Sequence, residues 1–368
     1  MFEINARKTL RQFLRKIENS GYIKTANGKA NMYAGRSQLA LYLRSKGSNN
    51  KIMLSYQVIK QALQYTFYQR TVTRKDLEIY TKGANSALLG VLIEIFAHQC
   101  KISRGRSGLL RLTISGIRYY FAGCERSVRD LEVAAECGAR FVLMSYAHIR
   151  NRHAWKEHVD RLGLKVLLDS GAFTIWSAKK RGREVQQIDI EEYALFIKEN
   201  QQRLFSWFNL DVVGDPIAST KNADYLKLQG LQPIEVWHVS ADVSELERLV
   251  DEEPPVIAIG GSVGLSEKKR KKAFEEIFRR FPNQNFHFLG GSSKLLNEFN
   301  WFSADSTGWL ACRKYGAIFN QYGQQKAPAD CTWVEAMKSS CTYFAGLETT
   351  EGRKETVHEY SYVSSKTG

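Results

Sequence analysis

Polar residues and glycines end a series of short β-rich runs in the second, larger part of the chain. The run "LLDSGAF" contains Asp169 and Ser170, "NLDVVGD" contains Asp211, and "FNWFSADSTGWL" places Asp305 among four aromatic residues. Carboxylates are rarely buried without a partner, so such an aspartate either caps a strand end or is kept partly desolvated for chemistry. The series continues with Tyr146 in "MSY", His238 in "VWH", Gly260 and Gly261 in "AIGGS", and Gly290 and Gly291 in "LGGSS".

Each of these residues also has a purely structural interpretation. Aspartate and serine at strand ends often cap helices, and glycine makes turns. Three aspartates, a histidine and two Gly-Gly pairs at one site would instead allow one carboxylate to attack a carbon while another moves protons. We therefore predict that these strand ends converge on a functional site.

The elements that would bring them together are eight β-rich runs that alternate with helical segments. Amphipathic stretches such as "SVRDLEVAAEC", "DIEEYALFIKENQQ" and "EKKRKKAFEEIFRRF" lie between the runs. This alternation predicts an α/β fold, a closed (β/α)₈ TIM barrel, whose strands present their carboxyl ends to one shared mouth. The runs are residues 117–123, 140–146, 165–173, 206–215, 233–240, 256–264, 285–293 and 300–309.

The charge is distributed unevenly along the 368 residues. Residues 1–115 contain 20 Lys and Arg but only 5 Asp and Glu, whereas the remaining residues contain 33 of each kind. This asymmetry predicts a nucleic-acid-binding module attached to a neutral domain, with a well-solvated basic surface as the alternative.

Residues 57–115 have the pattern of a winged helix-turn-helix. The stretch "QVIKQALQYTFYQR" predicts one helix, Thr73 is placed to cap a second starting at Arg74, and "ALLGVLIEIFAHQ" predicts a third. "CKISRGRSGLLRLTI" then predicts a β-hairpin with a basic tip. A module of this kind can also bind proteins. The residues expected to contact nucleic acid are Arg74, Lys75, Lys82, Lys101, Arg104 and Arg106.

The rest of the chain divides around these two parts. Residues 1–56 are expected to form a basic helical segment with one helix at "ARKTLRQFLRKIEN", so the whole N-terminal part is predicted to be mainly helical. The (β/α)₈ barrel is expected over 116–345, and a polar tail over 346–368. We expect a cytoplasmic protein with reduced thiols, because there is no apolar span of roughly 18 residues, no secretory pattern and no CxxC pair among the six cysteines.

The series "LLDSGAF", "NLDVVGD", "AIGGSVG", "FLGGSS" and "WFSADST" resembles, in this order, the tRNA-guanine transglycosylase superfamily. The likeness covers roughly residues 116–320. The forms "DSGAF" and "DSTGW" are most similar to the branch that inserts 7-deazaguanines into DNA, found in phages and bacterial modification clusters. The resemblance implies a (β/α)₈ barrel that exchanges guanine in a polynucleotide for a base such as preQ0 through a covalent sugar–enzyme intermediate.

The resemblance also implies a role for individual residues. Asp305 matches the nucleophile that attacks C1′, and Asp169 matches the carboxylate that moves protons on the departing and arriving bases. Such roles suit an oxocarbenium-like transition state and a purine that must be protonated to leave. The residues implied in base binding are Ser170, Phe173, Asp211, His238, Gly260, Gly261, Leu289 and Gly290, with Phe173 and Leu289 sandwiching the ring and His238 standing where the tRNA enzymes have glutamine.

Two departures from the tRNA enzymes favour DNA as the partner. The tRNA enzymes have a closely spaced Cys/His zinc site after the barrel, whereas Cys312, Cys331 and Cys341 are widely separated here, so we predict no metal and no cofactor. The winged-helix-like N-terminal part is also absent from the simple tRNA enzymes. The expected partners are DNA and a 7-deazaguanine base, in the host cytoplasm if a phage encodes the protein; no membrane is expected, and the oligomeric state is not indicated.

Three alternatives remain open from the sequence. The chain could be a tRNA-guanine transglycosylase with an unusual N-terminal extension. It could be an inactive barrel that serves as a DNA-binding regulator through residues 57–114. It could also be a hydrolase that cleaves N-glycosidic bonds without inserting a new base, because both reactions use the same pair of acids.

Overall fold

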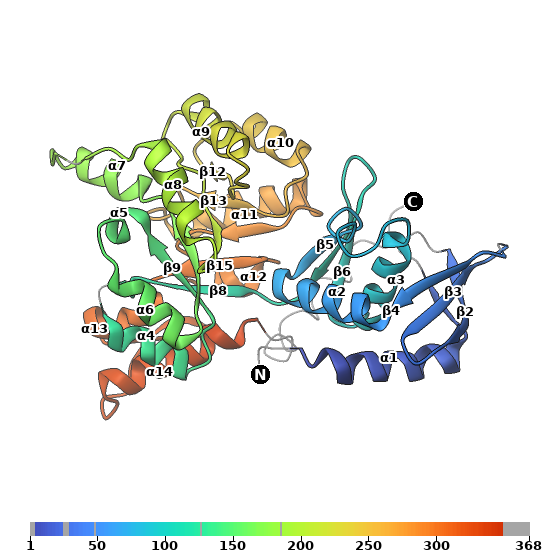
Figure 1. Cartoon of the computed structure of the whole chain (residues 1–368). Helices are drawn as coiled ribbons and strands as arrows, with labels where there is room; N and C mark the ends of the chain where they lie inside the picture. Colours follow the sequence, from blue (N-terminus) through green and yellow to red (C-terminus); the bar gives the residue numbers. More distant parts are fainter. Residues whose placement is uncertain (1–3, 25–28, 48, 126, 185, 349–368) are drawn as a thin grey trace, which may run out of the picture. The chain divides into compact units, whose positions relative to one another are not determined.

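The chain forms two compact units, Met1–Ser115 and Gly116–Gly368 (Figure 1). The structure is a computed structural model that describes residues 4–24, 29–47, 49–125, 127–184 and 186–348. Each unit has its own buried apolar residues: one cluster extends from Ala6 to Ile114, and two others lie between Ile117 and Leu347. Residues 1–56 and 57–115, which the sequence suggested as separate domains, therefore share one core.

The N-terminal unit begins with a helix and an antiparallel sheet. Helix α1 (Ala6–Ser20) is capped by Asn5, whose side chain accepts the Lys8 N–H at 2.9 Å. It buries an apolar stripe that includes Leu10, Phe13 and Ile17. Four antiparallel strands follow in the order in which they occur in the chain: β1 (Tyr22–Lys24), β2 (Ala30–Arg36), β3 (Ala40–Ser45) and β4 (Lys51–Ser55).

This sheet corrects the prediction of a mainly helical N-terminal part. Residues 22–55 contain few long apolar runs, so their alternation is weak in the sequence. In the sheet, Leu41, Leu43 and Leu54 are fully buried in the core that α1 also covers. Strands form here although each buries only a few alternate residues. Hydrogen bonds and side-chain contacts with the neighbouring strands stabilise them.

The second half of the N-terminal unit contains the predicted helices and hairpin. Its elements are α2 (Tyr56–Gln69), β5 (Thr71–Thr73), α3 (Asn85–Ile95), β6 (Cys100–Arg104) and β7 (Leu110–Ile114). The three strands form an antiparallel sheet in the order β5-β7-β6. The first and third helices and the hairpin expected from the sequence are thus present.

The helix expected to start at Arg74 is absent. Residues 74–80 form consecutive turns, in which the Leu77 N–H donates to the Arg74 carbonyl at 3.3 Å. The Thr73 N–H and hydroxyl both donate to the Asp76 carboxylate, at 2.7 and 2.8 Å. This contact resembles one half of a helix capping box, but the residues that follow it form turns and no helix.

The C-terminal unit is built on one curled sheet of eight parallel strands, which confirms the eight β-rich runs. The spatial order is β11-β10-β9-β8-β15-β14-β13-β12. The two outer strands approach each other, since Phe208 pairs with Ile234 in a parallel bridge and the Asn209 N–H donates to the Ile234 carbonyl at 2.9 Å. The strands are β8 (Arg118–Ala122), β9 (Phe141–Ser145), β10 (Lys165–Asp169), β11 (Leu204–Trp207), β12 (Val236–His238), β13 (Ile257–Gly260), β14 (Phe286–Phe288) and β15 (Ser303–Ser306).

Helices connect the parallel strands and cover one face of the sheet. Alternate residues of each strand enter different clusters: Tyr119 and Phe121 pack in the large cluster with the helices, whereas Tyr120 and Ala122 enter the small cluster on the inner face. The helices are α4 (Val128–Glu136), α5 (Tyr146–Ile149), α6 (Ala154–Leu162), α7 (Ala172–Lys180), α8 (Ile190–Asn200), α9 (Pro216–Leu228), α10 (Val243–Asp251), α11 (Glu267–Arg280) and α12 (Leu295–Glu298).

The unit ends in a short helical and hairpin segment after the last parallel strand. Its elements are the 3₁₀ turn η1 (Gly308–Leu310), α13 (Ala311–Tyr315), the antiparallel pair β16 (Ala317–Asn320) and β17 (Gly323–Lys326), and α14 (Trp333–Gly346). The tail predicted from residue 346 lies, from residue 349 onward, outside the described residues. Among the described residues, no helix combines the length and apolarity that a membrane crossing needs.

Candidate functional site

The predicted site residues lie at the carboxyl ends of the parallel strands. Asp169 ends β10, and Asp305 lies within β15, beside Tyr120 of β8. His238 ends β12 in register with Gly260, the last residue of β13. Because all eight strands point the same way, these ends meet at one edge of the curled sheet.

Asp305 is held in place by a chain of hydrogen bonds from β14. Its Oδ1 accepts the Nε2–H of His287 at 3.1 Å and the backbone N–H of Gly290 at 3.2 Å. The Nδ1 of His287 lies 2.8 Å from the Ser303 hydroxyl. Since a carboxylate only accepts, Nε2 carries the proton and Nδ1 accepts from Ser303. Within the described residues Oδ2 receives no hydrogen bond, so one oxygen of Asp305 is held by two donors and the other by none.

The position of Gly290 in this chain depends on its being a glycine. Its φ is +72°, in the left-handed region, and a Cβ there would lie 2.7 Å from Cγ2 of Val263. The residue therefore brings its N–H to Asp305 at a turn that a larger residue would strain.

Asp169 is partly buried near two other carboxylates. Its pKa is raised from 3.8 to about 7, mainly by desolvation and to a smaller extent by the charges of Asp211 and Asp305. The nearby Ser145 hydroxyl and the Gly171 N–H, which donates to Oδ2 at 3.0 Å, oppose this shift in the pKa. Asp169 can thus be protonated at neutral pH and can also lose its proton there, which suits a group that acts as acid and then as base.

Asp211 and His238 form a polar pair beside these two aspartates. The Nε2 of His238 lies 3.0 Å from Oδ2 of Asp211, and the Ser170 hydroxyl lies 3.5 Å from Oδ1. The imidazole also lies against the two glycines, because a Cβ on Gly260 or Gly261 would be 3.2 Å from its Nδ1. The structure therefore brings together five of the residues implicated in base binding, with backbone exposed beside the imidazole.

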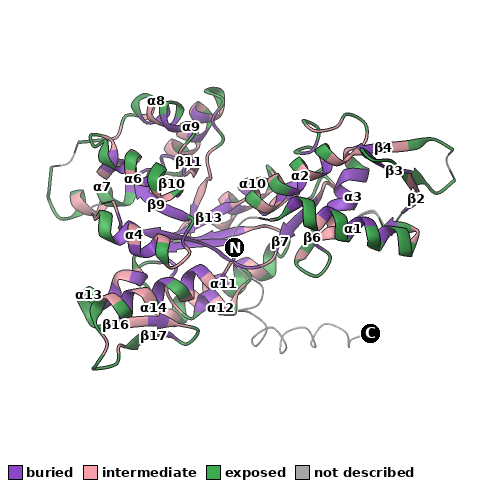
Figure 2. Cartoon of the chain, turned by 60° about the horizontal axis from the view of Figure 1, so that its bottom comes forward, coloured by how far each residue is buried: buried purple, intermediate pink, exposed green. Residues whose placement is uncertain are grey.

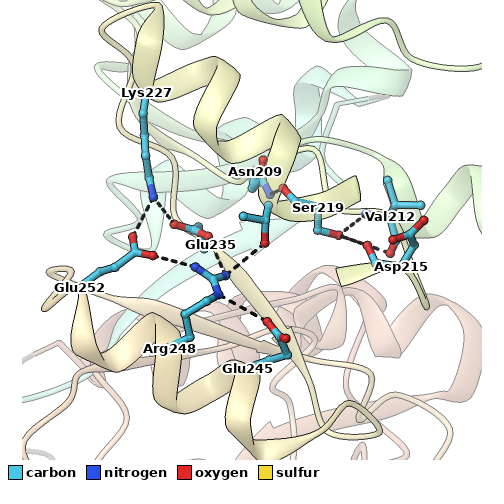
Figure 3. A network of polar contacts seen from close by, with 10 residues as sticks. Asn209, Val212, Asp215, Ser219, Lys227, Glu235, Glu245, Arg248 and Glu252 are labelled. Carbon is cyan, nitrogen blue, oxygen red and sulfur yellow. Dashed lines mark hydrogen bonds and ion pairs between the residues drawn. The ribbon is translucent and has the colours of Figure 1, made fainter. Parts of the chain in front are cut away.

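The loop that carries Asp211 is fixed by side chains of α9 (Figure 3). The Ser219 hydroxyl accepts the Val212 N–H at 2.8 Å, and the Asn209 amide donates to the Ser219 carbonyl at 2.8 Å. Lys227 of the same helix pairs with Glu235 (2.7 Å) and Glu252 (2.8 Å), connecting α9 to β12 and α10. These contacts hold Asp211 in place without using its carboxylate.

Phe173 and Leu289, the predicted ring sandwich, have different surroundings. Leu289 packs partly buried against the inner cluster of the sheet. Phe173 lies in the first turn of α7 and is 56% exposed, with its ring centroid 5.7 Å from that of Trp176. Tyr146 belongs to the helical layer instead, where its ring contacts Tyr193 and Phe196 at centroid distances of 5.1 Å.

The six basic residues predicted to bind nucleic acid are all exposed on the N-terminal unit. Arg74 and Lys75 lie in the turns after β5, and Lys82 lies before α3. The others lie on β6 or at the tip between β6 and β7; they are Lys101, Arg104 and Arg106.

The cysteines do not form a group of metal ligands. Among the described residues, no three His, Cys, Asp or Glu side chains are placed to hold a metal ion. Cys341 lies fully buried beside Cys137, the residue that follows α4, and this contact is the main reason that the pKa of the Cys137 thiol is lowered to about 7. Cys331 lies apart, with its thiol 3.4 Å from the Thr332 carbonyl. The absence of zinc stays a prediction, to be tested by elemental analysis.

Sequence reasoning missed His287, Ser303 and Ser145. In "NFHFLGG", His287 lies between two phenylalanines and has the pattern of an ordinary buried strand residue. Because side chains alternate along a strand, His287 lies on the opposite face from Phe286 and Phe288. A polar residue on the inner face of the sheet could have been recognised from the sequence as a candidate site residue. The pairing of His287 with Ser303 across the β14–β15 register became visible only in the structure.

We expect His287→Phe to slow the reaction of this site without removing it. The ring volume is nearly kept, but Asp305 loses one of its two donors and the Ser303 hydroxyl loses its acceptor. We predict a 10- to 100-fold lower kcat with nearly unchanged KM for the base, and a loss of about 1–3 kcal/mol in unfolding free energy. Ser303→Ala should have a smaller effect, and the exposed His153→Phe none. Equal kcat in His287→Phe and wild type would contradict this role.

Comparisons with known proteins do not name an activity. No family model matches the chain, and no curated protein matches it. Solved structures that match the chain include tryptophan synthase from M. tuberculosis in an open form with BRD0059 bound, at 8% identity and a TM-score of 0.40, covering 64% of this chain and 94% of that chain. A protein from a structural study of Aquifex aeolicus VF5 has 11% identity, a TM-score of 0.39 and coverages of 64% and 94%. A structure described as native KDPGal has 9% identity, a TM-score of 0.36 and coverages of 62% and 92%. Similarities at this level carry no conclusion about substrate or reaction.

Proposed function

We propose that this chain is a (β/α)₈ pentosyltransferase that replaces guanine in DNA with a 7-deazaguanine such as preQ0. The observation that carries the proposal is the pairing of two differently held carboxylates at one edge of the sheet. Asp305 has one oxygen fixed by two donors and the other available, whereas burial raises the pKa of Asp169 to about 7. Two carboxyl groups in such different environments suit a nucleophile and an acid–base group.

In the first half of the proposed reaction, Oδ2 of Asp305 attacks C1′ of the target deoxyribose. The C1′–N9 bond breaks, its electron pair goes to the departing guanine, and protonated Asp169 supplies a proton to a ring nitrogen of that base. The product is an ester between Asp305 and C1′, and Asp169 is left as a carboxylate.

The second half reverses these steps with a different base. The carboxylate of Asp169 takes the N9 proton of the incoming 7-deazaguanine, N9 attacks C1′, and Asp305 leaves as a carboxylate. Asp211, His238 and the Gly260–Gly261 backbone provide donors and acceptors for the edge of the planar base. Atoms and charge balance without a metal or a redox cofactor.

The proposed assignment of DNA binding to the N-terminal unit rests on its charge and its element order. Helix α2, strand β5, helix α3 and the β6–β7 hairpin, with sheet order β5-β7-β6, are compatible with a winged helix. A basic hairpin tip with Arg104 and Arg106 suits phosphate contacts.

The direct test is base exchange on defined nucleic acids. Purified protein should incorporate labelled guanine or preQ0 into guanine-containing duplex DNA, with nucleoside mass spectrometry as the readout. Exchange on tRNA but not on DNA would favour the tRNA activity, and abasic sites without incorporation would indicate a hydrolase. DNA binding with neither product would indicate a regulator and contradict the proposal.

Removal of residues 1–115 should weaken DNA binding and make it less sensitive to salt. The C-terminal unit has its own buried clusters, so we expect it to fold alone, as circular dichroism and a cooperative melt would verify. The slope of log K against log salt between about 50 and 200 mM should fall by about 0.9 for each lost phosphate contact. An unchanged slope would exclude the N-terminal unit as the main anchor.

A further inference from the structure

Helix α7 packs on the protein less than its neighbours do. Of its nine residues, only Ala172 is buried. Each of α4, α6, α8, α9, α10 and α11 buries at least two residues. In Figure 2, α7 is therefore drawn almost entirely in the colours of exposed and intermediate residues. A helix with so little packing of its own presents most of its surface for another molecule.

One face of α7 carries two aromatic rings and a cation. Phe173, Trp176 and Lys180 follow one another at helical spacing and so share this face. Phe173 is 56% and Trp176 38% exposed, and their rings are inclined by 33°. The Nζ of Lys180 lies 5.1 Å from the centroid of the Trp176 ring. Single exposed apolar residues are common, but adjoining rings with a cation form a continuous stacking surface.

Positively charged residues follow these rings in the chain. The exposed segment at the end of α7 contains Lys179, Lys180, Arg181 and Arg183, with Glu184 as its one acidic residue. This concentration lies in a part of the chain, residues 116–368, that contains equal numbers of acidic and basic residues in total. Arg150, which follows α5, adds a further cation, and its Nη2 donates to Gln186 at 2.8 Å.

The face begins beside the catalytic carboxylates. Gly171 lies between Asp169 and α7, with a φ of +85°. A Cβ at Gly171 would lie 2.6 Å from the Cβ of Ala147, so only glycine fits at this turn without strain. Phe173 is thus four residues from Asp169 in the chain, and the Phe173–Trp176–Lys180 face extends from the site along α7.

We propose that the Phe173–Trp176–Lys180 face and the basic segment 179–183 bind the unpaired nucleotides next to the exchanged base. This inference rests on the proposed function, because exchange at C1′ requires the target base to leave its stack and exposes the faces of its neighbours. A neighbouring base stacks on Trp176, while the cations contact the phosphates on either side. Flat rings interleaved with cations suit a nucleotide strand better than an acidic protein, which offers charge without planar faces.

The deciding experiment is photocrosslinking of the full-length protein to a short single strand that contains 5-iodouracil, in DNA and RNA versions. We expect the crosslinked peptide to include Trp176, and the version that reacts more to identify the preferred nucleic acid. Because residues 1–115 carry their own excess charge, the position of the crosslink separates the two binding surfaces. Crosslinks confined to the N-terminal unit would overturn the proposal.

Affinity measurements supply the matched controls. Trp176→Ala should weaken binding of the single strand about 5- to 100-fold, and Trp176→Phe should restore most of it. Trp333→Ala should bind like wild type, although Trp333 is also exposed and has the Arg313 guanidinium 4.9 Å from its ring centroid. Replacing both Lys179 and Lys180 with alanine should reduce the salt slope by about 1.4. Equal affinities for Trp176→Ala and Trp333→Ala would contradict the proposal, as would Trp176-dependent dimerisation with unchanged strand binding.

These outcomes are separable from those that test base exchange. Exchange that persists with a Trp176-independent strand affinity would contradict this surface and leave the proposed function standing. Trp176-dependent binding in a protein that never exchanges guanine would contradict the proposed function and leave a single-strand binding surface.

Discussion

Asp305→Asn should abolish base exchange and the covalent intermediate, lowering the rate by more than about 10³-fold. The amide keeps the size of the side chain and can still accept from His287 and Gly290, but it lacks the negative charge that the proposed attack on C1′ requires. DNA affinity should stay within about twofold of wild type if the N-terminal unit provides most of the binding energy. The measurements are incorporation of labelled base and denaturing electrophoresis of protein–DNA adducts.

Asp242→Asn is the matched control for this variant. Asp242 is an exposed aspartate that caps α10, where its side chain accepts the Ser244 N–H at 2.8 Å, and asparagine caps about as well. We expect this control to exchange bases at the wild-type rate. A wild-type rate in Asp305→Asn itself would refute Asp305 as the nucleophile.

Asp169→Asn should lower exchange by about 10²- to 10⁴-fold and remove a pH dependence centred near pH 7. In the proposed reaction, formation of the adduct and release of guanine need the protonated acid, so this half-reaction should slow in wild type as the pH rises through about 7. Transfer of the sugar to the incoming base needs the carboxylate and should slow as the pH falls through the same value. Single-turnover rates should be measured for each half-reaction over roughly pH 5 to 9, on both sides of this pKa. They would reveal both limbs of the pH–rate profile.

The same variant has a second, independent readout in stability. Because burial raises the pKa of Asp169 above its ordinary 3.8, the folded state binds this proton more tightly than the unfolded state. The stabilisation is complete below pH 3.8 and is lost as the pH rises to about 7. Asp169→Asn should therefore be more stable than wild type at pH 8, on the order of 2 kcal/mol, with little or no gain near pH 4.

Asp189→Asn is the control for this pair of measurements. Asp189 caps α8 at the surface, where it accepts the N–H groups of Glu191 and Glu192. Neither the pH profile nor the stability gain should appear in this control. A wild-type pH profile in Asp169→Asn would exclude Asp169 as the proton carrier.

The sequence alone determined the eight parallel strands of the C-terminal unit, but not the β16–β17 hairpin and the helix α14 that follow them. Eight β-rich runs alternating with amphipathic helices predicted eight parallel strands, and all eight occur in one sheet. This worked because each strand packs against the helical layer and carries its own apolar residues, so the pattern is local. The position of Asp169, Asp211, His238 and Asp305 at strand ends follows from the same pattern.

Local patterns were insufficient in the N-terminal unit. The strands at 22–55 bury few residues each, and their stability comes from pairing with neighbouring strands, which no short window of sequence contains. Thr73 and Arg74 carried a valid helix-start signal, and Thr73 does donate to the Asp76 carboxylate as at a helix start, but residues 74–80 form turns. A signal confined to the first turn does not determine whether a helix continues.

At the site, the sequence supplied the reactive groups and the tertiary structure decided their environments. The raised pKa of Asp169 requires burial together with charges from Asp211 and Asp305, which are 42 and 136 positions away in the chain. The orientation of Asp305 requires the register that sets His287 against Ser303. Both are long-range effects, because electrostatic and hydrogen-bond energies depend on distances in space, which become short only when parallel strands align.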